Sequence, residues 1–197
     1  MDAVALLVSK LKIISWNVNS LRAREPLVQK LIQKEKPNIL CLQELKIDDQ
    51  NYVLNFFDSY HYATISQNQK SYNGVSISYK KEILTKDLTI SELNKLQARN
   101  NVLLLEKEGI AIINNYFPNG NPIDTEKFPY KLDWMDLLYN QVKQLKKNYE
   151  VIVTGDFNVI PADDDAHDIK KYRKDALAQP ETRKEFYKLL NLDLLDV

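Results

Sequence analysis

Short apolar runs rich in β-branched residues recur along this chain and limit what it can fold into. Their length and composition are typical of β-strands. Several are apolar at nearly every position, which indicates strands that are covered on both faces. The expected strands are 12–16, 38–42, 75–79, 102–105, 110–116 and 151–154.

Segments with helical periodicity separate some of these runs. Between the first two, the apolar residues of 27–32 repeat at helical spacing, with Pro26 expected in the first turn and Pro37 ending the segment. Two further helices are expected over about 131–146 and 181–190. No repeat, low-complexity tract or linker interrupts the pattern. The sequence therefore predicts one α/β domain with layers of sheet and helix.

Polar side chains with oxygen atoms follow four of the expected strands. These side chains belong to Asn17, Gln43 with Glu44, Tyr116, and Asp156 with Asn158. A buried carboxylate or carboxamide is costly unless it is paired or binds a metal. Sites in α/β proteins form where the carboxyl ends of strands meet at one edge of a sheet. We therefore expect these side chains to form a site.

A donor set of oxygens without nearby cysteine or histidine suits a hard cation such as Mg²⁺ or Mn²⁺. Glu44 with phosphate oxygens would satisfy Mg²⁺, and Asp156 could orient and deprotonate a water. Asn17, Asn158 and the Tyr116 hydroxyl could donate to the developing charge. The implied reaction is metal-assisted phosphodiester hydrolysis. The alternative is that both asparagines are turn residues and that Tyr116 is a half-buried aromatic with a satisfied hydroxyl.

Composition excludes several other classes. The chain has 197 residues and no net charge, which gives no global attraction to nucleic acid. Its single cysteine, Cys41, excludes an internal disulfide, and its four glycines are too far apart for a dinucleotide or nucleotide-phosphate loop. Cys41 is expected to be an inert core thiol. No apolar run near the start approaches the ~20 residues of a membrane span, so a cytoplasmic protein is expected.

Six segments in a fixed order carry a resemblance to a known family. They are Ile-Ser-Trp-Asn-Val-Asn-Ser-Leu-Arg-Ala-Arg at 14–24, Leu-Gln-Glu-Leu-Lys at 42–46, Tyr-Asn-Gly-Val at 72–75, Asn-Tyr-Phe-Pro-Asn-Gly at 115–120, Lys-Phe-Pro-Tyr-Lys at 127–131 and Gly-Asp-Phe-Asn at 155–158. The last alone would fit the wider endonuclease/exonuclease/phosphatase superfamily. Together the segments resemble the exonuclease III family of abasic-site (AP) DNA repair endonucleases.

The resemblance implies a fold and an activity. The fold is a two-layer β-sandwich flanked by helices, similar to pancreatic deoxyribonuclease. The activity is Mg²⁺-dependent cleavage of double-stranded DNA at abasic sites, with 3′–5′ exonuclease activity at 3′ ends, in base excision repair. The abasic sugar would be extruded from the stack to reach the site.

The resemblance also assigns roles to individual residues. It implies that Glu44 binds the metal with Asn17 helping to hold it, that Tyr116 acts at the phosphate, and that Asp156 acts on the attacking water. Asn158 would donate to the scissile phosphate. The backbone phosphates of DNA would be bound near Arg22, Asn73, Gly74 and Asn119.

The sequence departs from the family pattern after Asp156. Family domains continue through an Arg-Ile-Asp segment to a terminal Ser-Asp-His, and residues 157–197 contain neither. The two histidines, His61 and His167, lie in other contexts and are expected at the surface. We therefore expect an incomplete domain over 12–197 that lacks the C-terminal strands, preceded by an extension over 1–11. The isolated chain is expected to be impaired as a nuclease.

Two other functions remain open. One is a non-catalytic remnant that binds DNA, or half of a split enzyme that needs a separate chain carrying the missing strands. The other is a phosphodiesterase or phosphatase of the superfamily with a different substrate. That alternative is disfavoured because its members lack the Lys-Phe-Pro and Leu-Arg-Ala segments found here.

Overall fold

A computed structural model of the chain describes residues 11–83, 86–88 and 99–197. Within these residues the strands form two four-stranded sheets. The first sheet has the order β1-β2-β4-β3, and the second has the order β5-β6-β7-β8. The strands are β1 (Ile13–Asn17), β2 (Ile39–Gln43), β3 (Tyr62–Gln67), β4 (Val75–Lys80), β5 (Lys86–Leu88), β6 (Asn100–Leu105), β7 (Ile110–Tyr116) and β8 (Glu150–Asp156).

Each sheet has one parallel pair at its border. In the first sheet β1 runs parallel to β2, and in the second β7 runs parallel to β8. The remaining pairs are antiparallel. β1 and β8 are therefore the outer strands of their sheets, and they contact each other.

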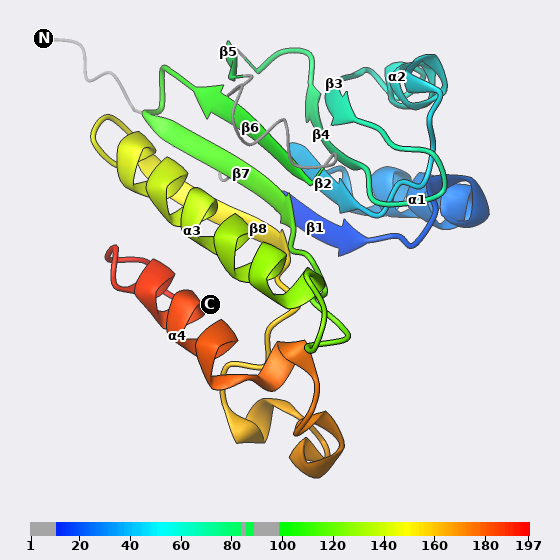
Figure 1. Ribbon diagram of the computed structural model, residues 1–197. Coiled ribbons are helices and arrows are strands. Elements are labelled where there is room, and N and C mark those ends of the chain that lie inside the picture. Colours follow the sequence, from blue (N-terminus) through cyan, green and yellow to red (C-terminus); the bar gives the residue numbers. More distant parts are fainter. Residues whose placement is uncertain (1–10, 84–85, 89–98) are drawn as a thin grey trace, which may run out of the picture.

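Helices cover the outer faces of both sheets, as Figure 1 shows. The first sheet packs against α1 (Leu21–Glu35) and α2 (Gln50–Asp58), and the second against α3 (Lys127–Leu145) and α4 (Pro180–Leu190). Three short 3₁₀ helices connect β8 to α4; they are Asp163–Asp165, Ile169–Tyr172 and Ala176–Ala178. The expected two-layer β-sandwich flanked by helices is confirmed.

The core between the sheets is apolar, and one polar bridge crosses it. Its buried members are Ile39, Cys41, Ile77, Leu103, Leu105 and Ile112. Next to this core, Gln43 donates to the Asn114 side-chain oxygen at 2.6 Å. Asn114 in turn donates to the carbonyl oxygens of Leu42 and Ser76, both at 2.9 Å. These buried amides satisfy one another and fix the position of β7 relative to the first sheet.

The six expected strands are present, with bounds that differ by a few residues, whereas α2, β3 and β5 were not predicted. The expectation that Pro26 lies in the first turn of its helix is wrong. α1 begins at Leu21, where Ser20 accepts a hydrogen bond from the Ala23 backbone, so Pro26 lies inside the helix. The expected extension over 1–11 lies, except for Leu11, outside the described residues. In the described part of the chain, no helix could cross a membrane.

Candidate active site

The carboxyl ends of the two parallel pairs meet at one edge of the sandwich. Asn17 is the last residue of β1, Glu44 directly follows β2, and Asp156 ends β8. The Asn17 side-chain nitrogen donates to Glu44 Oε1 and to Asp156 Oδ2, both at 2.8 Å. One amide therefore links a carboxylate of the first sheet to a carboxylate of the second. The structure thus joins three of the residues that the strand ends predicted.

Glu44 lies in a pocket of hydrogen-bond donors. Its backbone has a φ of 55°, an uncommon conformation for a residue other than glycine, and such strain is frequent at functional sites. Lys46 Nζ lies 2.8 Å from Glu44 Oε2. Burial alone would raise the pKa of Glu44, but hydrogen bonds from Asn17, Lys46 and Tyr116 outweigh it and lower the pKa. The carboxylate is therefore ionised at neutral pH.

The turn after β8 brings Asp156 and Asn158 close to β7. Gly155, the penultimate residue of β8, has a φ of 134°, and a Cβ there would lie 1.9 Å from the Asn115 carbonyl oxygen of β7, so this position requires glycine. The Asn158 backbone N–H donates to Asp156 Oδ1 at 3.0 Å, and its side chain donates to the Phe117 carbonyl oxygen at 3.0 Å. Asn158 is thus a turn residue, as the alternative interpretation expected, and it also lines the cavity at the site.

Tyr116 lies between the carboxylate of Glu44 and the half-buried guanidinium of Arg99. Burial, together with the charge of Glu44 and a hydrogen bond to it, raises the pKa of Tyr116 to about 12. The phenol is therefore protonated at neutral pH and can donate. The Arg99 guanidinium lies 4.7 Å from the centre of the Tyr116 ring and donates to the Tyr116 carbonyl oxygen at 3.2 Å. Sequence reasoning did not identify Arg99.

The four residues expected to bind DNA do not all lie together. Asn73 and Asn119 line one cavity of about 630 Å³, which Arg99 also lines. Gly74 follows Asn73, directly precedes β4 and has a φ of 88°. Arg22 lies apart on α1, where its guanidinium covers the ring of Tyr52 at 4.8 Å. A second cavity of about 460 Å³ is lined by site residues including Asn17, Asp156 and Asn158.

The donors at the site fit a hard divalent cation. Asp156 lines the second cavity, and the Asn17 amide joins its carboxylate to that of Glu44, while the Asn17 oxygen accepts from the Asn19 backbone at 3.0 Å. Asn17 therefore presents its nitrogen to both acids. Among the described residues no group of three or more His, Cys, Asp or Glu could hold a metal. Mg²⁺ needs only one or two carboxylates when water and phosphate complete its shell.

Other residues singled out in the sequence lie away from the site. Cys41 is buried in β2, and burial raises its pKa to about 12, as expected for an inert thiol. His61 and His167 are exposed. Residues 163–165 form an exposed 3₁₀ turn in which Asp163 pairs with Arg183 at 2.7 Å.

Sequence comparisons find a family and named relatives. The sequence profile of the Endonuclease/Exonuclease/phosphatase family matches residues 14–193. An exodeoxyribonuclease of Bacillus subtilis is 30% identical over 188 residues, which cover 94% of this chain and 73% of that protein. Exodeoxyribonuclease III of Haemophilus influenzae is 30% identical, and the match covers 78% of this chain and 59% of that protein. The chain thus spans less than two thirds of the Haemophilus relative.

Solved structures of two proteins, a 3′ phosphatase and an AP endonuclease, share the fold of this chain. A Neisseria 3′ phosphatase, NExo, bound to a product DNA hairpin has a TM-score of 0.82 and is 32% identical. An AP endonuclease from Archaeoglobus fulgidus has a TM-score of 0.79 and is 31% identical. Each match covers 93% of this chain and 71% of the other.

Proposed function

Because the chain belongs to the endonuclease/exonuclease/phosphatase family, we propose that its site hydrolyses phosphodiester bonds in DNA with Mg²⁺, as an AP endonuclease and 3′–5′ exonuclease of base excision repair. The observation that carries the proposal is the Asn17 amide, which holds Glu44 and Asp156 together across two sheets at 2.8 Å. Because one amide bonds both carboxylates, a cation ligand and a proton acceptor lie at one place. The names of the relatives support DNA as the substrate.

Each residue has a separate task in this proposal. Glu44 holds the cation, which when bound would neutralise phosphate charge. Asp156 orients the attacking water and accepts its proton. Tyr116, protonated because its pKa is about 12, donates to a phosphate oxygen. Asn158 donates beside it, and Asn17 keeps the two acids in position.

In this proposal DNA binds at the cavity of about 630 Å³. Asn73 and Asn119 line it with Arg99, so amide donors and a cation face the same space. Such groups bind backbone phosphates without reading sequence. Arg22 lies on α1 and would contact the duplex from the side of the first sheet. The substrate is double-stranded DNA with an abasic site or a 3′ end.

The test is cleavage of a duplex with one abasic site in Mg²⁺, run beside the Bacillus exodeoxyribonuclease. Glu44→Gln and Asp156→Asn should each abolish any cleavage, while the exposed control Glu108→Gln should leave it unchanged. A hairpin with a 3′ phosphate is the second substrate, since the Neisseria protein is a 3′ phosphatase. We expect slower turnover than in the Bacillus enzyme. Cleavage that survives both acid substitutions would refute the assignment.

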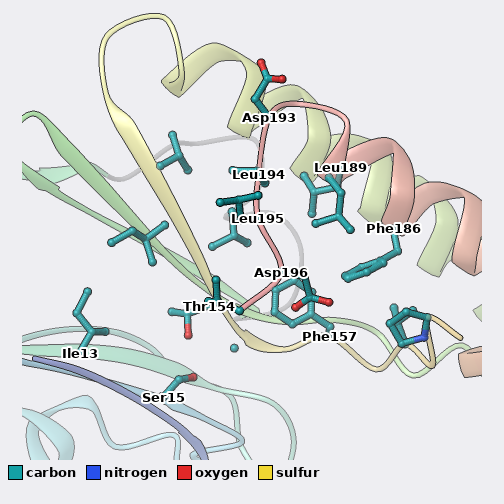
Figure 2. Close-up of a pocket in the computed structure, with 18 residues that line it drawn as sticks. Ile13, Ser15, Thr154, Phe157, Phe186, Leu189, Asp193, Leu194, Leu195 and Asp196 are labelled. Atoms are coloured by element: carbon teal, nitrogen blue, oxygen red, sulfur yellow. The ribbon is translucent and has the colours of Figure 1, made fainter. Parts of the chain in front are cut away.

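A groove next to the site favours a second candidate, a split enzyme that needs a separate chain. A cavity of about 740 Å³ lies between β8, α4 and the C-terminal segment, and Ile13 and Ser15 of β1 also line it. Figure 2 shows Phe186 and Leu189 of α4 facing this space beside Leu194 and Leu195. Among the described residues β1 and β8 are both edge strands, and 29% of the length of each of the two solved relatives lies outside the match.

An edge strand offers free backbone groups to a further strand. In this candidate a partner segment pairs with β8 and covers the groove. Mixing the chain with the unmatched segment of the Bacillus exodeoxyribonuclease should then raise cleavage. A stable, stoichiometric complex that binds abasic DNA without cleaving it would instead support a non-catalytic DNA-binding role.

A further inference from the structure

Lys131 is fully buried between the two loops that follow β7 and β8. It lies in the second turn of α3, and its side chain has 0% exposure. Its Nζ donates to the backbone carbonyl oxygen of Asn119 at 3.2 Å and to that of Asn158 at 2.5 Å. One ammonium group therefore joins the loop that lines the DNA cavity to the loop that carries Asn158.

Stability alone does not account for a lysine at this position. The ammonium group of Lys131 is withdrawn from water, and its hydrogen-bond acceptors are the backbone carbonyl oxygens of Asn119 and Asn158. Burial lowers the pKa of Lys131 to about 8, although Asp175 and Asp156 oppose this effect. An apolar side chain of similar length would fill the space without this cost. The unfavourable location is what is expected at a functional position.

The loop after β7 is shaped around the stem of this side chain. A Cβ at Gly120 would lie 2.8 Å from Lys131 Cδ and 3.0 Å from the Cβ of Ala176. The side chain of Asn121 donates to the side-chain oxygens of Asn119 and Asp175, at 2.8 and 2.9 Å. The loop is thus packed on the stem of Lys131 and bonded to its ammonium group.

The loop after β8 depends on the same ammonium group. Asn158 has a φ of 47°, in the left-handed region that asparagine adopts more readily than most other residues except glycine. Its carbonyl oxygen accepts from Lys131, its N–H donates to Asp156 Oδ1 and its side chain donates to the Phe117 carbonyl oxygen. Three bonds therefore fix the direction in which Asn158 faces the site.

We propose that Lys131 is a positioning residue that sets the loops of Asn119 and Asn158 at the spacing required to bind one DNA phosphate backbone. It touches neither the DNA nor the reacting atoms and acts through the two backbone carbonyls. The inference deepens the proposed nuclease function, because it names what determines the geometry of that site.

The first test uses the wild-type chain and needs no activity. In ¹⁵N- and ¹³C-labelled protein, the Lys131 Nζ signal should show hydrogen-bond couplings to the carbonyl carbons of Asn119 and Asn158. In Lys131→Met, the backbone amide signals of 119–121 and 156–159 should shift. The matched control is Lys143→Met, an exposed lysine at the other end of α3, and it should leave these signals in place. A resolved Nζ signal that couples to neither carbonyl would overturn the proposal.

The second test separates positioning from simple packing. Lys131→Met should unfold at the same urea concentration as the wild type or a higher one, yet cut abasic DNA about tenfold or more slowly, with kcat falling further than KM changes. Lys131→Arg, which keeps the donors, should recover part of the loss. Unchanged kcat in Lys131→Met would refute the positioning role. If the wild type itself does not cleave, the proposed nuclease function fails, while the couplings and amide shifts still decide the role of Lys131.

Discussion

Removing the Asn17 amide should disrupt the site more than it disrupts the fold. Asn17→Ala deletes the two hydrogen bonds that the amide nitrogen donates, one to Glu44 Oε1 and one to Asp156 Oδ2, each 2.8 Å long, together with the bond that its oxygen accepts from the Asn19 backbone. A hydrogen bond to an ionised group contributes about 1.5–3 kcal/mol. The lower value applies here because water can reach this half-buried site. The two bonds then amount to about 3 kcal/mol, which corresponds to a loss of about 100-fold in kcat/KM if both act in the transition state.

The same substitution should also change the pKa of Glu44 in a direction that can be measured. The pKa of Glu44 is lowered in the folded chain, because the donors Asn17, Lys46 and Tyr116 outweigh the effect of burial. A lowered pKa adds stability above the pKa of the unfolded chain, and this stability is lost as pH falls through the folded value. Asn17→Ala should raise the pKa of Glu44. Its free energy of unfolding should therefore depend less on pH on the acid side than that of the wild type.

Two measurements decide this prediction. Metal-free ¹³C NMR gives the pKa of the Glu44 carboxyl, and single-turnover cleavage of abasic DNA gives the rate. Asn140→Ala is the matched control, since Asn140 is an exposed asparagine whose side chain donates to Asp136, away from the site. An unchanged or lower pKa of Glu44 in Asn17→Ala would show that the amide does not hold the acid, and the reasoning would fail.

Three further outcomes are expected. Gly155→Ala, whose Cβ would lie 1.9 Å from Asn115 O, should lower the free energy of unfolding by about 4 kcal/mol or more in urea titrations, whereas Gly109→Ala, with open space around it, should cost about 1 kcal/mol. The buried thiol of Cys41, with a pKa of about 12, should resist a thiol reagent at pH 8 until urea unfolds the chain. Asn114→Leu should destabilise the chain by about 2 kcal/mol, since its partners lose their bonds.

The elements that the sequence predicted are those whose apolar pattern reaches the core. β2 is buried at every position, and β7 at five of seven, so the sequences of both strands are mostly apolar. β3 was missed because it is mostly half-buried and reads Tyr-Ala-Thr-Ile-Ser-Gln, with no clear alternation. β5 has three residues, too few for a pattern.

The sequence predicted the part of the site that lies at the ends of apolar strands. Glu44 and Asp156 were found because each follows an apolar strand, and a charge there needs a partner. Lys46, Arg99 and Lys131 were not, because each reaches the site from a position where a basic residue normally faces solvent. Lys131 lies inside a segment that the family resemblance included, and that was the one signal available. Its contacts with Asn119 and Asn158 depend on how α3 packs against the loops after β7 and β8, and a single sequence does not reveal this packing.

The topology explains why one amide can hold two acids. A parallel pair ends both of its strands at the same edge, as Asn17 lies opposite Gln43 in the first sheet and Tyr116 lies opposite Asp156 in the second. The two parallel pairs are also the border pairs whose outer strands, β1 and β8, contact each other. Side chains from 139 positions apart in the sequence are thereby brought within hydrogen-bond distance. Any change that alters the packing of β1 on β8 should therefore change the site before it unfolds either sheet.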